Sequence, residues 1–377
     1  RCMVFTPHID ISALEPRLAR LEALRREVED LDVPPPLARW LARYVEARGA
    51  HMSTRIEGNP MTEREVLELF DEGSGPSSRA ERENLDYRDA ARFAVQAAGD
   101  FHADIDGGLI RAFHFLTVRT TDPYATAGQY RTTQNAVMAG SRRAYLPPPP
   151  GEVPGRMDGL VAWLREQRHR LHPLILASVA HAEFVKVHPF DDGNGRAARA
   201  LSVYFMVRGG WRLRGFVGVE QAFGEEVDEY RARLNDLGEQ YPGSSPNLTE
   251  WAAWFLDRLS AEIVLDLTVA DTYRMVVAER FPAAMTAAGL PERLTHAYGI
   301  IWLNGSITAR DYAQAAAVTA PTASTDLRRL VDLRVLRRQG RGRATRYAPI
   351  DPAFVLDRAR LRQAALDAAV PPTHPGA

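Results

Sequence analysis

Residues 188–199 read HPFDDGNGRAAR and place a histidine, two aspartates and two arginines between two apolar segments. Gly193 and Gly195 let backbone N–H groups converge on one point, and a helix beginning near Arg196 directs its N-terminal amides and dipole to the same place. Such a loop is suited to holding phosphate. A solvated turn between two helices would explain the glycines, but neither the histidine nor the arginines.

The charged side chains of this stretch add to that chemistry. Arg196 and Arg199 lie three residues apart, hence on one helix face, where each can bind further phosphate oxygens. Asp192 is a hard oxygen ligand suited to Mg²⁺. A neutral imidazole at His188 can accept the proton of an attacking hydroxyl. Together these residues predict a site for attack on a magnesium-bound polyphosphate.

The spacing argues against three other kinds of site. A P-loop requires a lysine followed by serine or threonine, and this stretch has neither. An EF-hand beginning at Asp192 would place Val203 at the position of the closing glutamate. His181 and His188 do not form a recognised pair of zinc ligands. A phosphate site is therefore the better interpretation.

The stretch resembles the signature of the Fic family, H-x-F-x-[D/E]-G-N-G-R-x-x-R, with every specified position filled. The resemblance implies a mainly helical fold that transfers AMP from ATP to a serine, threonine or tyrosine hydroxyl of a target protein. It implies His188 as the general base and Asp192 as the Mg²⁺ ligand. The residues that it implies for binding the ATP phosphates are Gly193, Asn194, Gly195, Arg196 and Arg199.

Two further features follow from this resemblance. Tyr230, in the segment EYRARL, lies where the family builds its adenine pocket and is a candidate for it. Residues 132–146 resemble the family's β-hairpin flap, which would align a target segment by strand addition. The complete G-N-G-R portion separates the chain from the Doc relatives, which transfer phosphate. Transfer of phosphocholine stays open.

A second motif, STRIEGN at residues 53–59, resembles the family's inhibitory motif [S/T]-x-x-x-E-[G/N]. Glu57 falls in the last turn of its expected helix, where the helix dipole disfavours an anion. The resemblance implies Arg199 as its partner, and Ser53, one turn earlier, would add a hydrogen bond. The alternative is a solvated glutamate at a helix end. Whether Glu57 also supports removal of AMP stays open.

Residues 291–350 resemble a winged helix-turn-helix domain, with APTASTDLRRLVDLRVL as recognition helix and GRGRATRYAP as wing. Eight arginines and one acidic residue, Asp332, fall between Arg328 and Arg346. This excess suits the phosphate backbone of DNA, but solvated arginines on a protein-docking module are an equal alternative. The residues that could face a groove are Thr322, Ser324, Thr325 and Arg328.

The whole chain has 377 residues and a formal net charge of −1, which excludes a globally basic nucleic-acid binder. Cys2 is the only cysteine, so disulfides within one chain and cysteine-built zinc sites are excluded. No membrane is expected as partner, because every apolar run is too short to span one. The first residues lack the apolar core of a signal peptide, so a cytoplasmic protein is expected. Lys186 is the only lysine, which we interpret as coding bias.

We therefore predict a mainly α fold, in which a Fic-type helical bundle with a small β-hairpin flap is followed by a winged helix-turn-helix domain. The expected divisions are N-terminal helices with the inhibitory helix (1–62), a Fic catalytic domain (63–270), a linker helix (271–290), a winged helix (291–350) and a tail (351–377). The oligomeric state is left open, with a homodimer as one option.

The predicted activity is that of a self-inhibited adenylyltransferase that uses ATP and Mg²⁺. A rival from another class is a DNA-binding transcriptional regulator whose Fic body only senses nucleotide. Labelled ATP separates the two hypotheses, because only the enzyme leaves label on protein that disappears when His188 is replaced.

Overall fold

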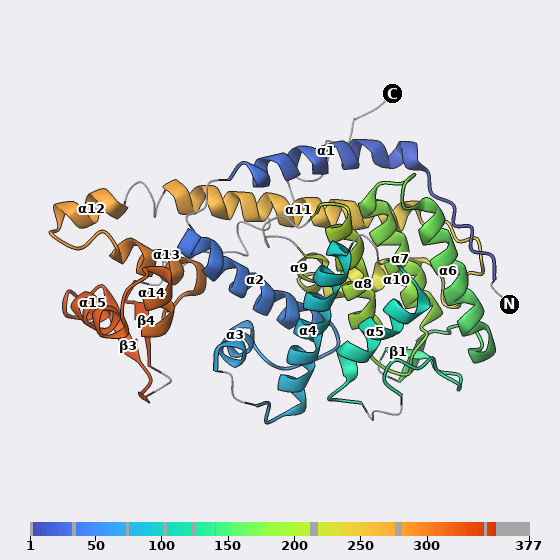
Figure 1. The fold of residues 1–377 in the computed structure, drawn as a ribbon, viewed down its shortest axis with the longest axis horizontal. Helices are drawn as coiled ribbons and strands as arrows, with labels where there is room; N and C mark the ends of the chain where they lie inside the picture. Colours follow the sequence, from blue (N-terminus) through green and yellow to red (C-terminus); the bar gives the residue numbers. More distant parts are fainter. Residues whose placement is uncertain are drawn as a thin grey trace. The chain divides into compact units, whose positions relative to one another are not determined.

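The computed structural model describes residues 3–31, 35–72, 75–100, 104–122, 126–139, 141–211, 218–275, 281–342 and 345–351 (Figure 1). Contacts divide the chain into two compact units. Unit 1 comprises residues 1–26 and 45–260, and unit 2 comprises residues 27–44 and 261–377. The domain bounds expected from the sequence stay a prediction, and most of the predicted tail lies outside the described residues.

Unit 1 is built from helices, as predicted. Those that belong to it wholly or in part are α1 (Ile11–Glu29), α2 (Pro35–Ile56), α3 (Glu63–Glu72), α4 (Arg79–Gly99), α5 (Gly107–Val118), α6 (Val153–Gln167), α7 (Pro173–Val187), α8 (Asn194–Arg208), α9 (Val219–Gly224), α10 (Val227–Asp236) and α11 (Thr249–Tyr273), with a 3₁₀ turn, η1 (Pro150–Glu152). Helices α7 and α8 pack against each other, and α4 and α5 both pack against α8 (Figure 1).

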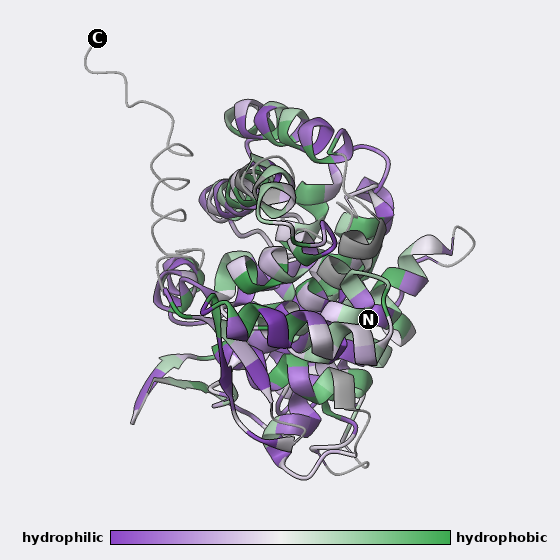
Figure 2. Ribbon diagram, turned by 90° about the vertical axis from the view of Figure 1, so that its left-hand side faces the viewer, coloured by the Kyte–Doolittle hydropathy of each residue, from purple (hydrophilic) through white to green (hydrophobic). Residues whose placement is uncertain are grey.

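Helices α7 and α8 form the centre of this unit because nearly all their side chains are buried. A helix that is buried all round belongs in a core. Most other helices carry hydrophobic and hydrophilic residues side by side along their length (Figure 2). Pro173 opens α7 at a position where a missing N–H costs nothing, and His172 Nδ1 accepts a hydrogen bond from Leu174 N at 3.2 Å. The signature begins directly after α7 and runs into α8, so it lies between these two buried helices.

The predicted hairpin is present in unit 1 as two short antiparallel strands, β1 (Val137–Ala139) and β2 (Arg142–Tyr145). Leu146, directly after β2, forms a parallel bridge with Gln240 beyond α10. The hairpin is thus attached at its base to the segment that follows α10. Its use as a flap stays a prediction.

Unit 2 ends in helices followed by a hairpin. Its remaining elements are α12 (Phe281–Ala287), α13 (Leu294–Asn304), α14 (Ala309–Ala315), α15 (Ala320–Asp332), β3 (Leu336–Gln339) and β4 (Arg346–Pro349). Strands β3 and β4 are antiparallel, and Ile307 adds an antiparallel bridge to Tyr347. This order matches the one expected for a winged helix, but that assignment stays a prediction.

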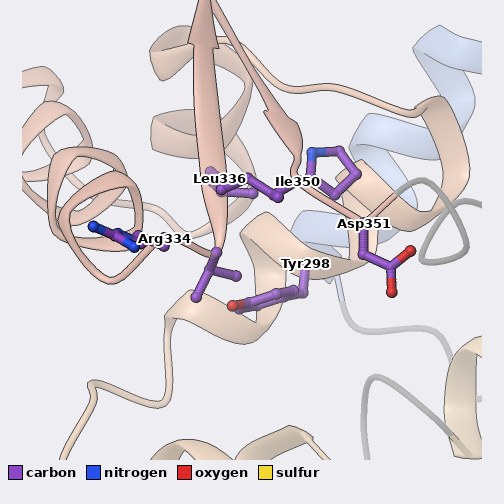
Figure 3. Close-up of a pocket in the computed structure, with 7 residues that line it drawn as sticks. Tyr298, Arg334, Leu336, Ile350 and Asp351 are labelled. Atoms are coloured by element: carbon purple, nitrogen blue, oxygen red, sulfur yellow. The ribbon is translucent and has the colours of Figure 1, made fainter.

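Polar contacts to the buried carboxylate of Asp326 join the helices of unit 2. Arg293 donates from Nε and Nη2 to the carboxylate of Asp326 at 2.7 and 2.9 Å, and Tyr312 OH donates to the same carboxylate at 2.8 Å. The contacts link α14 and α15 to the residue before α13. A pocket of about 340 Å³ opens beside α13 and the hairpin, lined in part by Tyr298, Arg334 and Leu336 (Figure 3). It contains none of the signature residues.

Among the described helices, none combines the length and the apolar character that crossing a bilayer requires.

Candidate active site

The candidate base lies at the end of α7 in an unusual backbone conformation. His188 has φ 50° and ψ 58°, in the left-handed region, and its N–H donates to Phe184 O at 3.0 Å. A residue other than glycine rarely adopts this conformation, which is enriched at functional sites. Arg131 Nε donates to the His188 carbonyl at 2.8 Å. The backbone around the imidazole is therefore held by contacts from outside α7.

The His188 imidazole is half-buried, and its Nδ1 lies 3.3 Å from the carbonyl oxygen of Val185. Burial lowers the pKa of His188 to about 4, so the ring is neutral at pH 7. A proton on Nδ1 donates to that carbonyl, which leaves the lone pair of Nε2 available to accept another proton. This state is the one that a general base requires.

The loop between His188 and α8 is closed by its own side chains. Phe190 is fully buried and stacks on His114 with ring centroids 3.7 Å apart. Asn194 donates from Nδ2 to Phe190 O at 2.8 Å and accepts from Phe190 N at 2.9 Å. The Asn194 amide thus fixes the shape of the loop. Its predicted contact with phosphate stays a prediction.

The two glycines of the loop allow close approach. Gly193 has φ 74°, and a Cβ atom there would lie 2.5 Å from Val118 Cγ1. A Cβ atom on Gly195 would lie 2.2 Å from Glu57 Oε1. Position 195 therefore accommodates the present placement of Glu57 only because it carries no side chain.

The predicted contact between Glu57 and the second arginine of the signature is present. Arg199 is fully buried, and its Nη2 donates to Glu57 Oε1 at 2.7 Å. Arg199 also donates from Nε to Ser53 Oγ at 2.8 Å and from Nη2 to Ser53 O at 2.9 Å. Helix α2 ends at Ile56, so Glu57 is the first residue after the helix and not part of its last turn. Arg231 Nη2 donates to Ile56 O at 2.7 Å and caps this helix end.

Arg196 is buried, and both of its terminal nitrogens donate hydrogen bonds. Its Nη1 donates to Thr117 O at 3.2 Å and its Nη2 to Asp192 Oδ2 at 3.4 Å. The Nε of Arg196 and the Nη1 of Arg199 are buried and have no hydrogen-bond partner among the described residues. Because unpaired buried N–H groups are costly, each of these two donors suits an anionic ligand.

The Asp192 side chain is 57% exposed, so its carboxylate is accessible to a metal ion that arrives with a nucleotide. Its Oδ1 accepts from Gly193 N at 2.7 Å. Within the described ranges, no group of three or more His, Cys, Asp or Glu side chains gathers that could hold a metal ion. Mg²⁺ at nucleotide sites is often held by one or two carboxylates plus phosphate oxygens and water, and Asp192 fits that arrangement.

Comparison with known proteins agrees with this geometry. Residues 104–206 match the model of the Fic/DOC family. The chain contains a Fic domain. Protein adenylyltransferase Fic of Drosophila grimshawi is 31% identical over 201 residues, which cover 52% of this chain and 40% of the relative. Protein adenylyltransferase fic-1 of Caenorhabditis elegans is 30% identical over 207 residues, covering 53% and 39%. The chain thus spans about 40% of the length of these relatives.

Solved structures confirm the predicted helical fold. A Fic family protein from Desulfovibrio desulfuricans G20 aligns with a TM-score of 0.55 and 22% identity over 91% of this chain and 98% of that one. A fragment of Fic-1 from C. elegans aligns with a TM-score of 0.55 and 26% identity, covering 70% and 74%. The first of these likenesses concerns the fold alone.

The structure places Tyr230 in an aromatic cluster of the first unit. Tyr230 is 3% exposed, stacks on Phe223 with centroids 4.9 Å apart, and its hydroxyl lies 2.9 Å from His181 Nε2. The Tyr230 ring is therefore packed against Phe223, and its hydroxyl is in contact with His181. A role in binding adenine stays a prediction.

Two residues of the Fic domain that the sequence analysis missed organise the site. His114 accepts from Gly128 N at its Nδ1 (2.9 Å), so its Nε2 carries the proton and donates to Asp192 O at 2.9 Å. Arg131, besides its bond to His188, donates to the carbonyls of Thr133, Pro148 and Val187. Both act on backbone carbonyls far away in sequence, which leaves no periodic pattern to detect.

Proposed function

We propose that the chain is a protein adenylyltransferase that transfers AMP from ATP to a hydroxyl side chain of a target protein or of itself. The complete signature carries this proposal, because it gathers a neutral imidazole, an exposed carboxylate and two buried arginines with unpaired donors around one loop. The matches to proteins named protein adenylyltransferase support it.

In the proposed reaction, the hydroxyl oxygen attacks the α-phosphorus of ATP and the bond to the oxygen that bridges to the β-phosphorus breaks. His188 Nε2 takes the hydroxyl proton, and pyrophosphate leaves. Arg196 and Arg199 hold the leaving phosphates through their buried guanidinium groups. Asp192 would hold Mg²⁺, which when bound neutralises charge on the phosphates.

We further propose that Glu57 inhibits the transfer. Arg199 bonds Glu57 and Ser53 in the present arrangement, so it cannot also bind the γ-phosphate well. ATP that enters beside this ion pair would have its α-phosphorus poorly aligned for attack. A misplacement on the order of 1 Å can cost about a hundredfold in rate.

Labelled ATP tests both proposals. We expect strong label on protein for Glu57→Gly, weak label for wild type, and none for Glu57→Gly combined with His188→Ala. ATP binding should persist in the double variant, because the base acts on the hydroxyl and the arginines on the phosphates. If Glu57→Gly labels no more than wild type at several ATP concentrations, inhibition by Glu57 is wrong. If the double variant labels as strongly as Glu57→Gly, His188 is not the base.

A second candidate function, binding of duplex DNA by α15 and the β3–β4 hairpin, is favoured by one observation. Arg328, Arg334, Arg337 and Arg341 are exposed, and none of their side chains forms a hydrogen bond or ion pair with another residue that the structure describes. Some exposed arginines of unit 1 are compensated instead, since Arg64 pairs with Glu68 and Arg79 with Glu83 at 3.0 and 2.9 Å. Positive charge that the protein leaves uncompensated suits phosphates. Arg343 of the expected wing lies outside the described residues.

The salt dependence of duplex binding tests this second candidate. Neutralising Arg337 and Arg341 together should lower the slope of log affinity against log salt concentration by about two, at roughly 0.9 per lost phosphate contact. The matched control, Arg64→Ala with Arg79→Ala, should leave the slope unchanged. Absence of binding, or binding that does not depend on salt, would favour a protein-docking module. Duplex binding that responds to nucleotide, in a chain that labels nothing, would favour the regulator.

A further inference from the structure

Lys186 occupies a position where a buried amine joins three parts of unit 1. It is the only lysine of the chain, lies two residues before His188 and is 3% exposed. Its Nζ donates to Leu234 O at 2.9 Å and to Gly238 O at 2.8 Å. Both carbonyls belong to the end of α10 or the turn after it. The amine therefore attaches α10 to the last turn of α7.

The same lysine also contacts the hairpin. Nζ lies 3.8 Å from the ring centroid of Tyr145, the last residue of β2, and Tyr145 OH donates to Lys186 O at 2.6 Å. The next residue, Leu146, pairs with the backbone of Glu239 and Tyr241 at 2.9 and 3.0 Å. The base of the hairpin is thus held against α7 and the segment after α10 by these backbone bonds, and the Lys186 side chain contacts both the hairpin and the end of α10.

Burying the Lys186 amine without a carboxylate partner costs free energy. Burial lowers the pKa of Lys186 to about 8. The nearby acid, Glu183, accepts instead from Tyr241 OH at 2.5 Å. The ammonium is therefore balanced by two carbonyls and the Tyr145 ring, which is weaker compensation than a carboxylate. A methionine of similar shape would bury its side chain without that cost.

We propose that Lys186 is a positioning residue of the transfer reaction, which fixes the hairpin relative to α10 and to His188. A target segment that pairs with the hairpin would then present its hydroxyl at a set distance from the imidazole. This inference rests on the proposed function. Coding bias explains why the other basic positions carry arginine and not lysine. It does not explain why this buried position carries a basic residue at all.

Labelling in the Glu57→Gly chain tests the inference and keeps it separate from the proposed function. Adding Lys186→Met should lower the labelling rate per ATP-binding site by between about tenfold and a hundredfold, as a displacement of up to about 1 Å would. The ATP concentration for half-maximal labelling should change by less than about twofold. The control, Arg170→Met, removes an exposed cation whose partner is Glu166 and should leave both values unchanged.

The outcomes are distinct. If Glu57→Gly alone labels nothing, the proposed function fails before Lys186 is tested. If Lys186→Met labels at the parental rate, the inference is wrong. If Lys186→Met instead loses ATP-binding sites and rate in parallel, the lysine only stabilises the fold and the inference is also wrong.

A spectroscopic measurement adds an independent readout, because ¹⁵N-labelled lysine gives this chain one side-chain amine signal. In the full chain we expect slowly exchanging ammonium protons at neutral pH, because the amine is buried and donates to two carbonyls. Fast exchange like that of a solvated lysine would overturn the inference.

Discussion

At the scale of single residues, the site depends on side chains whose protonation is set by burial. The pKa of His188 is lowered to about 4 and that of His181 to about 3, in both cases chiefly by burial. Their consequences differ, because His188 lies at the open loop and His181 is fully enclosed. Both shifts make stability fall in acid, but only the protonation of His188 also removes the proposed base.

The pH dependence of labelling should report on His188. The base form is lost as the pH falls through its pKa, so Glu57→Gly should keep most of its rate down to about pH 5. An ordinary histidine would already lose half of it near pH 6.5. Measured labelling rates between pH 4 and 8 decide the point, and a half-maximal rate near pH 6.5 would show that the pKa of His188 is not lowered.

The stability of the chain at mild acid should report on His181. Its pKa is lowered on folding, so the unfolded chain binds a proton between pH 6.5 and about 3 and stability falls as the pH falls. From pH 7 to pH 5 this loss is on the order of 2 kcal/mol, and His181→Gln should escape it. Chemical denaturation of both proteins at the two pH values measures the difference. Equal losses would contradict a buried neutral ring.

At the scale of elements, the end of α2 is held by partners from other helices. Ser53 and Glu57 both bond Arg199 of α8, and Arg231 of α10 caps Ile56. Helices α2, α8 and α10 therefore meet at the C-terminal end of α2. Weakening any of these contacts should release Arg199 in part.

Ser53→Ala should raise labelling above wild type but less than Glu57→Gly does. The variant removes the acceptor of Arg199 Nε, while the bonds to Ser53 O and Glu57 stay. Removing one partner of a buried donor costs about 1–3 kcal/mol, which should shift Arg199 towards the nucleotide. The double variant should label no faster than Glu57→Gly, because both changes release the same arginine. Additive activation would show that Ser53 acts elsewhere.

The motifs allowed the site to be predicted because they are local. The signature lies within twelve residues, and its helix spacing already places Arg196 and Arg199 on one face. The distant contact between Glu57 and Arg199 could be predicted only through the resemblance to a known family. The end of α2 was misplaced by one residue, which is the usual uncertainty at a helix end.

The contacts of Arg131, His114 and Lys186 could not be predicted from the sequence. Each joins a side chain to backbone carbonyls of a segment brought close only by folding. Carbonyls are present at every residue, so nothing in the sequence marks which of them is the acceptor. Lys186 was interpreted as coding bias for this reason.

At the scale of the whole molecule, nucleotide binding and folding are linked. A ligand that binds only the folded chain stabilises it by RT ln(1 + [L]/Kd), so at one concentration a tighter ligand raises the melting temperature more. Mg²⁺ with ATP should therefore raise the melting temperature of Glu57→Gly more than that of wild type, because Arg199 is then free for phosphate. A bond between arginine and phosphate contributes about 1.5–3 kcal/mol. Equal increases in the melting temperatures of wild type and Glu57→Gly would show that freeing Arg199 from Glu57 does not strengthen ATP binding.

The close approach of Gly195 to Glu57 has a genetic consequence. Any side chain at position 195 would collide with the inhibitory carboxylate and displace it, yet the same residue shapes the loop that is proposed to hold phosphate. Replacements at 195 or 199 should therefore relieve inhibition and impair transfer together. A selection for hyperactive alleles should recover changes in residues 53–57 and none at the codons for Gly195 and Arg199. Of the ion pair Glu57–Arg199, only Glu57 can be replaced to relieve inhibition without also removing a phosphate-binding group.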